Sequence, residues 1–158
     1  MNRPASLDIR DEAIARSVLA LQRDSYAVEA ALIGSRDIPP LTETLEALQA
    51  ARSDWLGLFD EAGLAGAVAW KILDDGTVDI DRLVVAPRAF RRGIATALLD
   101  GLDARYPDRP TLVSTGRDNA PARDLYRRRG FTLVGEREAA PGLWVAELQR
   151  GRASAGRP

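Results

Sequence analysis

Residues 78–96 read Val-Asp-Ile-Asp-Arg-Leu-Val-Val-Ala-Pro-Arg-Ala-Phe-Arg-Arg-Gly-Ile-Ala-Thr, and this stretch decides the fold. Its first part is rich in β-branched and apolar residues, which predicts a strand over 77–85 that ends before Pro87. Its last part starts at Gly93, and the apolar stripe that follows predicts a helix over 94–105. A helix N-terminus presents free backbone N–H groups and partial positive charge, so a strand leading into such a helix is suited to binding phosphate.

The chain after this stretch alternates strand and helix. The elements predicted there are a strand at 111–115, a helix at 119–129, and strands at 131–136 and 143–149. Pro121 in the first turn and Gly130 just beyond the last turn bound the second helix in the usual way. The strands at 77–85 and 111–115, joined by a helix, should be parallel, with a right-handed crossover.

The chain before the stretch predicts helices followed by an antiparallel meander. The elements predicted there are a strand at 7–10, helical segments at 12–21 and 26–33, a short helix at 43–51, and strands at 55–60 and 64–73. Together these elements indicate an α/β (α+β) fold of three layers, in which helices flank a central mixed sheet of six or seven strands. We expect one domain over 1–150 and a disordered tail over 151–158.

The composition excludes several kinds of chemistry. The 158 residues include no cysteine and no histidine, so disulfides, Ser-His-Asp triads and Cys/His zinc sites are excluded, and we expect no metal site. Lys71 is the only lysine. The formal net charge is −1, which gives no general attraction to nucleic acid or to an anionic membrane. The absence of a signal peptide or a long apolar run makes a cytoplasmic location the expectation.

The run from Leu83 to Pro87, followed after three residues by Arg91-Arg92-Gly93-Ile94-Ala95, resembles the acyl-CoA-binding motif of the GNAT acetyltransferase superfamily. The resemblance implies a GNAT-like fold with acetyl-CoA as cosubstrate. In that family the strand backbone pairs with the pantetheine arm, and the loop and helix amides hold the pyrophosphate. The cofactor-binding residues implied by this motif are Leu83, Val84, Val85, Arg91, Arg92, Gly93, Ile94, Ala95 and Thr96.

The segment from Asn119 to Tyr126, closed by Gly130-Phe131, resembles the later helix of the same family. The resemblance implies cofactor contacts for Asn119, Ala122 and Tyr126, and it implies that Tyr126 is the general acid that protonates the thiolate leaving group. A core aromatic is the alternative role for Tyr126. Two features depart from the family pattern.

Both departures from the family pattern lie in the part of the motif that is expected to contact the phosphates of acetyl-CoA. Phe90 stands where the family usually has arginine or glutamine, which puts one side-chain contact to the phosphates in doubt, and Ala95 replaces a more frequent glycine. Neither change affects contacts that the backbone makes.

Asp79 and Asp81 are the candidates for the general base. Alternation along the strand places both on one face, together with Leu83 and Val85. Two carboxylates on one face raise each other's pKa, which suits a base that works near neutral pH, directly or through a water molecule. The structural alternative for the pair is a solvated rim that attracts cations, or a salt bridge to Arg82 or Lys71. The position of Asp79 resembles that of a family glutamate.

The acceptor is specified less well by the sequence. In GNAT-like folds the first helices and the last hairpin wall the acceptor site, here about 26–41 and 137–144. The residues expected to bind substrate are Tyr26, Glu29, Trp70 and Trp144. The acidic pI of about 5.6 favours a cationic amine, in a small molecule or a peptide, as the acceptor.

Two other classes of function remain open. One is a non-catalytic acyl-CoA-binding regulatory module with the same fold. The other is a nucleic-acid-binding domain that would use the basic run 127–129 with Arg91 and Arg92, although the acidic balance and the lack of alternating aromatic and basic residues oppose it. We expect no nucleic-acid or membrane partner, and a homodimer is possible.

Overall fold

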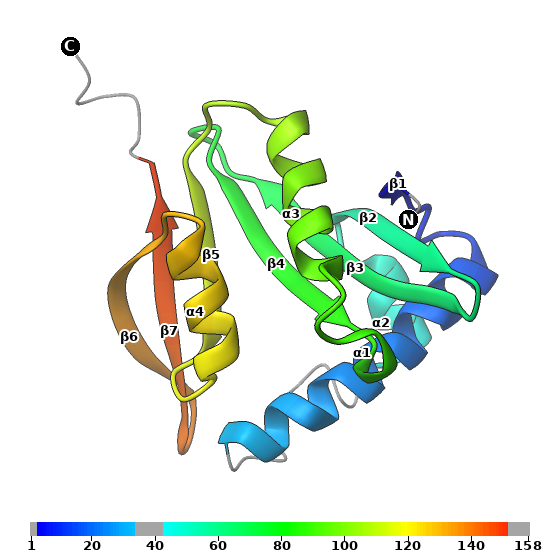
Figure 1. The fold of residues 1–158 in the computed structure, drawn as a ribbon, viewed down its shortest axis with the longest axis horizontal. Helices are drawn as coiled ribbons and strands as arrows, with labels where there is room; N and C mark the ends of the chain where they lie inside the picture. The colour runs from blue at the N-terminus through cyan, green and yellow to red at the C-terminus, as the bar shows by residue number, and fades with distance from the viewer. Residues whose placement is uncertain (1–2, 34–42, 152–158) are drawn as a thin grey trace.

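The computed structural model describes residues 3–33 and 43–151. They form a mixed seven-stranded sheet in the order β1-β2-β3-β4-β5-β7-β6, with α1 and α2 on one face and α3 and α4 on the other (Figure 1). The elements are β1 (Ala5–Ser6), α1 (Glu12–Ile33), α2 (Leu45–Ala50), β2 (Asp54–Asp60), β3 (Gly63–Ile72), β4 (Val78–Val85), the 3-10 turn η2 (Pro87–Ala89), α3 (Ile94–Arg105), β5 (Thr111–Gly116), α4 (Ala120–Arg128), β6 (Thr132–Ala140) and β7 (Leu143–Arg150). The predicted three-layer fold is confirmed.

The largest differences from prediction lie near the N-terminus. The strand predicted at 7–10 is wrong, because β1 ends at Ser6 and an Asp8 carboxylate accepts a hydrogen bond from the Arg10 backbone, which turns the chain. The helical segments predicted at 12–21 and 26–33 are parts of one helix, α1. Polar residues at 23–25 suggested a break, but without glycine or proline there the helix continues. No described helix is both long and apolar enough to cross a membrane.

The sheet consists of two halves that are joined over a short length. Strands β4 and β5 are parallel and pair only at Val78–Thr111, Asp79–Leu112 and Ile80–Val113. Beyond these pairs, β4 continues to Val85 and β5 to Gly116 without pairing to each other, while β5 stays paired with β7 along its whole length. Figure 1 shows the two strands separating toward the end where α3 begins. The sheet therefore opens between β4 and β5.

Each half of the sheet has its own helix on the same face. Helix α3 packs closely on β3. A Cβ atom at Gly66 of β3 would lie only 2.6 Å from the side chain of Ile94 in α3. Helix α4 belongs to the other half, where Tyr126 and Phe131 stack edge to face with ring centroids 5.3 Å apart. Burial of these apolar side chains fixes each helix on its own half-sheet rather than across the opening.

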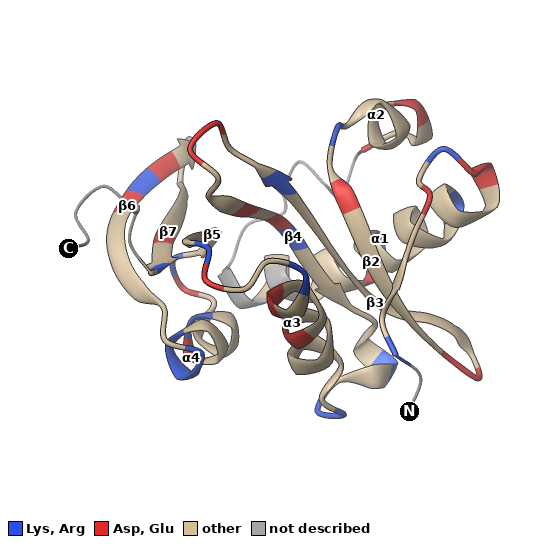
Figure 2. Cartoon of the chain, turned by 90° about the horizontal axis from the view of Figure 1, so that it is seen from above, with Lys and Arg blue, Asp and Glu red and all other residues tan. Residues whose placement is uncertain are grey.

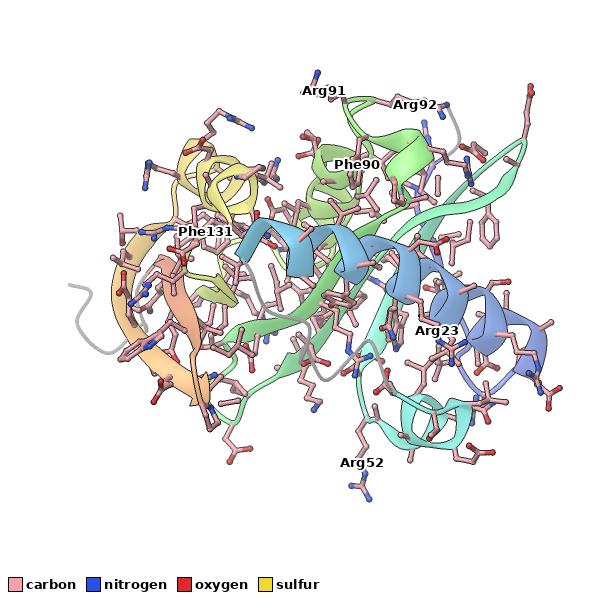
Figure 3. The ribbon with its side chains drawn as sticks, turned by 90° about the horizontal axis from the view of Figure 1, so that it is seen from below. Arg23, Arg52, Phe90, Arg91, Arg92 and Phe131 are labelled. Carbon is pink, nitrogen blue, oxygen red and sulfur yellow. The ribbon has the colours of Figure 1, made fainter. Side chains whose placement is uncertain are left out.

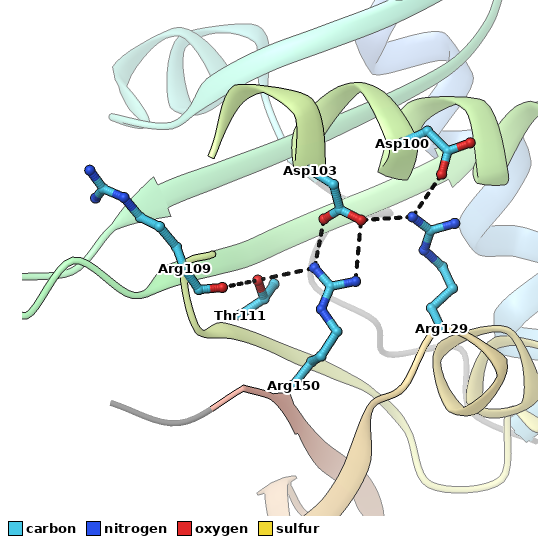
Figure 4. A network of polar contacts seen from close by, with 6 residues as sticks. All are labelled: Asp100, Asp103, Arg109, Thr111, Arg129 and Arg150. Atoms are coloured by element: carbon cyan, nitrogen blue, oxygen red, sulfur yellow. Dashed lines mark hydrogen bonds and ion pairs between the residues drawn. The ribbon is translucent and has the colours of Figure 1, made fainter. Parts of the chain in front are cut away.

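A cluster of charged residues ties the two halves together at the closed end of the opening (Figure 4). The Arg150 guanidinium, at the end of β7, donates hydrogen bonds of 2.6 and 3.2 Å to the two carboxylate oxygens of Asp103 in α3. Arg129, at the end of α4, donates to Asp103 at 2.8 Å and to Asp100 at 2.9 Å. We call Asp103, Arg129 and Arg150 the clamp.

The clamp places one carboxylate between two guanidinium groups. The Arg129 side chain is only 16% exposed and that of Arg150 27%, so the attraction is less screened than on an open surface. Burial by itself would raise the pKa of Asp103, but the hydrogen bonds and charges of Arg150 and then Arg129 hold it below its ordinary value. The clamp therefore stabilises the fold above the ordinary aspartate pKa, and this stabilisation is lost as pH falls through the lowered pKa.

The first prediction concerns Asp103→Asn. Loss of the carboxylate leaves two partly buried arginines without their shared partner, and we expect the free energy of unfolding to fall by about 1–3 kcal/mol at pH 7. Urea unfolding followed by circular dichroism measures this change. Asp124→Asn is the matched control, because Asp124 forms an exposed pair with Arg127 and its loss should cost at most about 0.5 kcal/mol. Equal stability losses in the two variants would contradict a special role for the clamp.

Candidate active site

The loop between β4 and α3 forms a phosphate-binding geometry. Arg91 and Gly93 both have positive φ angles, 64° and 78°, which turn the chain sharply before the helix. No side chain caps α3, and its first turn carries no acidic residue. The first amides of the helix are therefore free donors at a positive dipole end, which is the arrangement that binds phosphate oxygens. The role of the residues around Gly93 toward acetyl-CoA stays a prediction, and this geometry is the feature that supports it.

The same loop is fixed to the β2–β3 turn by an ion-pair cluster. The Asp60 carboxylate accepts from Arg88 at 2.5 Å and from Arg92 at 3.3 Å. The hydrogen bond from Arg88 lowers the pKa of Asp60. A cleft of about 520 Å³ lies between this turn and the loop. The pairing with Asp60 holds Arg92 beside the start of α3.

Arg91 differs from its neighbour Arg92, because its side chain has no hydrogen-bond or ion-pair partner among residues 3–33 and 43–151. Figure 3 shows Arg91 pointing away from the sheet at the rim of the loop. Phe90, 43% exposed, adds apolar surface beside it. An unpaired guanidinium is available to an anionic ligand without first breaking an ion pair.

Strand β4 has one free edge beside the loop that leads into α3. Leu83, Val84 and Val85 pair with β3 on one side, whereas the other side faces the opening and has no partner strand. An extended ligand with amide groups can pair with such an edge. The expectation that 83–85 contact the pantetheine arm stays a prediction, and the open edge is the feature that supports it.

A β-bulge in β4 corrects the predicted arrangement of the acidic residues. Pairing with β3 shifts by one residue at Asp81, which is the extra residue of the bulge. Residues paired across neighbouring strands share a face, so Asp79 and Arg82 lie on the α1 face, whereas Leu83 and Val85 lie on the α3 face. The prediction that both aspartates share a face with Leu83 and Val85 is wrong, because simple alternation does not pass through a bulge.

The Asp81 side chain also turns toward the α1 face. Its carboxylate accepts a hydrogen bond from the Ser53 hydroxyl at 3.2 Å and lies 3.4 Å from Nε of Arg82. The predicted salt bridge to Arg82, which was the structural alternative, is therefore present. With its side chain still 36% exposed, Asp81 combines this contact with access to solvent.

Asp79 lies in the environment expected for a base. Burial raises its pKa most, and the carboxylates of Asp81 and Glu147 raise it further, while Lys71 lowers it. Lys71 is the residue directly opposite on β3. Asp79 is half-buried and makes no ion pair closer than 4 Å within the described part of the chain. A carboxylate with a raised pKa is better matched to accepting a proton near neutral pH.

A buried polar cluster beneath Asp81 could not be inferred from the sequence as a unit. The Arg82 guanidinium donates to both carboxylate oxygens of Glu43 and to the side-chain oxygen of Gln22 in α1. Although burial alone would raise the pKa of Glu43, the hydrogen bonds from Arg82 and Gln22 keep it below its ordinary value. The only sequence signal was an arginine inside an apolar strand. The cluster joins β4 to α1 and to the start of α2.

The residues at α4 that were expected to contact acetyl-CoA make contacts within the protein itself. Tyr126 is 3% exposed and packs in the core, and Ala122 packs against that core. The Asn119 side chain accepts a hydrogen bond from the backbone of Ala122 and caps the helix. The roles of these three residues toward acetyl-CoA stay predictions.

The residues expected to wall the acceptor site are spread widely. Trp70 is fully buried and donates from Nε1 to the Tyr106 hydroxyl at 3.2 Å, on the α3 face. Trp144 is 38% exposed, with the Arg117 guanidinium 5.0 Å from its ring centroid. Tyr26 is half-buried in α1.

Parts of the expected wall cannot be placed. The Glu29 side chain and residues 34–42 lie outside the described residues. Of the four residues proposed to bind substrate, the structure therefore offers an exposed ring only at Trp144.

Two of the three arginines in the basic run 127–129 have acidic partners. Arg129 belongs to the clamp, and Arg127 lies 3.5 Å from the Asp124 carboxylate. Figure 2 shows basic segments on α4 but acidic and basic residues interspersed elsewhere.

Comparison with known proteins agrees with this geometry. The model of the acetyltransferase (GNAT) family matches residues 17–131. The solved structure of PaiA N-acetyltransferase from Thermoplasma acidophilum, in complex with coenzyme A, superposes with a TM-score of 0.72 at 16% identity and covers 96% of this chain and 100% of that one. The ribosomal-protein-S18-alanine N-acetyltransferase from Escherichia coli gives 0.70 at 18% identity, covering 95% and 93%. At these identities the two structures show a shared fold.

Two curated relatives match by sequence. UPF0157 protein YqkA of Bacillus subtilis is 34% identical over 141 residues, which are 89% of this chain and 41% of YqkA. Peptidyl-lysine N-acetyltransferase YiaC of Escherichia coli is 31% identical over an alignment of 91 residues that covers 51% of this chain and 61% of YiaC. The matched region is thus less than two thirds of either relative.

The second prediction concerns Gly93→Glu. A side chain at φ 78° is strained, and a carboxylate at the uncapped start of α3 opposes phosphate, so we expect the Kd for CoA to rise at least about tenfold by calorimetry. Gly142→Glu is the control, because Gly142 has a φ of 77° and equal free space but lies in the β6–β7 turn. Unchanged CoA affinity in folded Gly93→Glu would place the phosphate site elsewhere.

Proposed function

Because the chain belongs to the GNAT acetyltransferase family, we propose that it transfers the acetyl group of acetyl-CoA to an amine. The observation that carries the proposal is the opening between β4 and β5, which has a free strand edge along one side and an uncapped helix start at its end. An extended arm bearing a pyrophosphate matches these two features in that order. Acetyl-CoA has this shape, and the family uses it as acyl donor.

The phosphate end would be held by backbone and arginine donors. The free amides at 93–96 supply hydrogen bonds and dipole, and Arg91 supplies a charge that no ion pair within the described chain engages. Arg92 adds a second charge but stays tied to Asp60. The edge of β4 at 83–85 would pair with the amides of the arm. Backbone donors near the thioester would then stabilise the oxyanion that forms during transfer.

The residues proposed to transfer protons lie on opposite faces of the sheet, beside the opening. Asp79, with its raised pKa, is the proposed base for the amine, directly or through water, and Asp81 is the second candidate. Tyr126 is the proposed acid for the departing thiolate. Its burial in the core requires the thiol to reach α4 through the space between the half-sheets.

The acceptor is proposed to be a cationic amine. Asp79, Asp81 and Glu147 all lie toward the α1 face. Glu147 pairs with Arg137 and Asp81 with Arg82, so the negative charge that would attract an ammonium group is chiefly that of Asp79. YiaC, which shares 31% identity over part of the chain, is a peptidyl-lysine N-acetyltransferase, and a lysine side chain in a peptide is one amine of this kind. Small cationic amines have the same chemistry.

A non-catalytic acyl-CoA-binding module is the second candidate function. The observation that favours it is the burial of Tyr126, which is 3% exposed and stacked on Phe131. Intact-protein mass spectrometry under native conditions would detect CoA with either function. Release of free thiol from acetyl-CoA only when an amine is present supports the transferase, whereas CoA binding without any transfer across peptide and small amines would support the module.

The third prediction concerns Tyr126→Phe. This change keeps the stacking on Phe131 and removes only the phenol oxygen, so we expect turnover to fall ~10²-fold with nearly unchanged acetyl-CoA binding. Steady-state kinetics and calorimetry measure the two effects separately. Turnover within a factor of about two of the parent would make Tyr126 a structural residue.

The fourth prediction concerns the pH dependence of the rate. A base accepts a proton only when ionised, so the rate should fall as pH falls through the pKa of Asp79, which lies above the ordinary aspartate value. Asp79→Asn should remove this limb of the pH profile and Asp81→Asn should retain it. Retention of the limb in both single variants and in the double variant would move the base to another group.

A further inference from the structure

Lys71, which is the only lysine of the chain, lies beside the proposed base. It lies on β3 directly opposite Asp79 on β4. Directly opposite residues in an antiparallel pair have Cβ atoms about 4.5–5.5 Å apart and share a face. The Lys71 side chain is exposed, and within 3–33 and 43–151 it makes no hydrogen bond or ion pair. A primary amine on a flexible stem is therefore unengaged beside the proposed base.

The same pair of residues stands at the point where the sheet opens. The Asp79–Leu112 pair is the second of the three that join β4 to β5, and the strands separate after Ile80. Lys71 shares the α1 face with Asp79. Glu147 lies on the same face, because its partner Ser114 is two residues beyond Leu112, which pairs with Asp79. A four-carbon stem lets the Lys71 nitrogen extend from β3 past Asp79 toward the opening.

We propose that Lys71 is itself an acetyl acceptor, so that the protein acetylates its own side chain when no other amine occupies the site. This inference rests on the proposed acetyltransferase function. The neutral Lys71 nitrogen forms a C–N bond to the thioester carbonyl carbon, and the C–S bond of acetyl-CoA breaks. The proton lost by the nitrogen goes to Asp79, and the departing thiolate takes a proton from Tyr126 or from water. The products are Nε-acetyl-Lys71 and free CoA.

The modification would change the site that carries it. Acetylation removes the positive charge of Lys71, which lowers the pKa of Asp79, while burial, Asp81 and Glu147 all raise that pKa. Asp79 would then take up a proton at higher pH than before. The acid limb of the rate profile for an external amine should therefore move to higher pH after self-acetylation.

The test uses the whole chain and acetyl-CoA without an added amine. Intact mass followed by peptide mapping should find one acetyl group on Lys71, formed at a rate per molecule that does not depend on protein concentration. Lys71→Arg should show no acetyl group at position 71. Asp79→Asn, checked for folding by circular dichroism, should react at least about tenfold more slowly. Peptide mapping separates Lys71 from any reaction at the α-amino group.

Two results would overturn the proposal while leaving acetyl transfer intact. One is a Lys71 that stays unmodified with acetyl-CoA and no added amine, in a preparation that acetylates an amine when one is supplied. The other is modification of Lys71 at equal rates in the parent, in Asp79→Asn and in the urea-unfolded chain, which would mean uncatalysed chemistry. A preparation that neither binds CoA nor acetylates any amine would instead reject the proposed function together with this inference.

Discussion

Strands β4 and β5 hydrogen-bond at three residue pairs and then part, and the rest of the molecule is arranged around that separation. The parting exposes a strand edge inside the sheet, where backbone donors and acceptors are available to an extended ligand. It is tolerated because each half-sheet has its own helix and the buried apolar side chains of both halves belong to one core. The clamp on Asp103 holds the closed end, while the loop between β4 and α3 lies at the open end.

Charge divides the site into regions of opposite sign. The start of α3, with Arg91 and Arg92 beside it, is positive and suits phosphates. The α1 face of β4 is negative on balance, because Asp79, Asp81 and the neighbouring Glu43 outnumber Arg82 and Lys71 there. The bulge at Asp81 makes this separation possible, since it places Leu83 and Val85 on the α3 face, opposite to the face of Asp79.

The sequence predicted the elements that carry local signals. Helix α3 begins and ends where its glycine and apolar stripe indicated, and the β4–α3 junction was recognised from the motif around Gly93. Three features depended on contacts between distant residues and could not be predicted. These are the bulge, which reversed the face of Leu83, the Arg82–Glu43 cluster, and the clamp between α3 and β7. Long-range ion pairs leave no periodic pattern in a sequence.

Hydrogen exchange with and without acetyl-CoA tests most directly whether the opening between β4 and β5 is the donor site. Ligand pairing with the free edge of β4 and with the start of α3 should slow exchange at 83–85 and at 93–96, and should leave the outer strand β6 unchanged. Binding of acetyl-CoA with no protection in either segment, or with protection confined to β6, would contradict the assignment of the opening as the acetyl-CoA site.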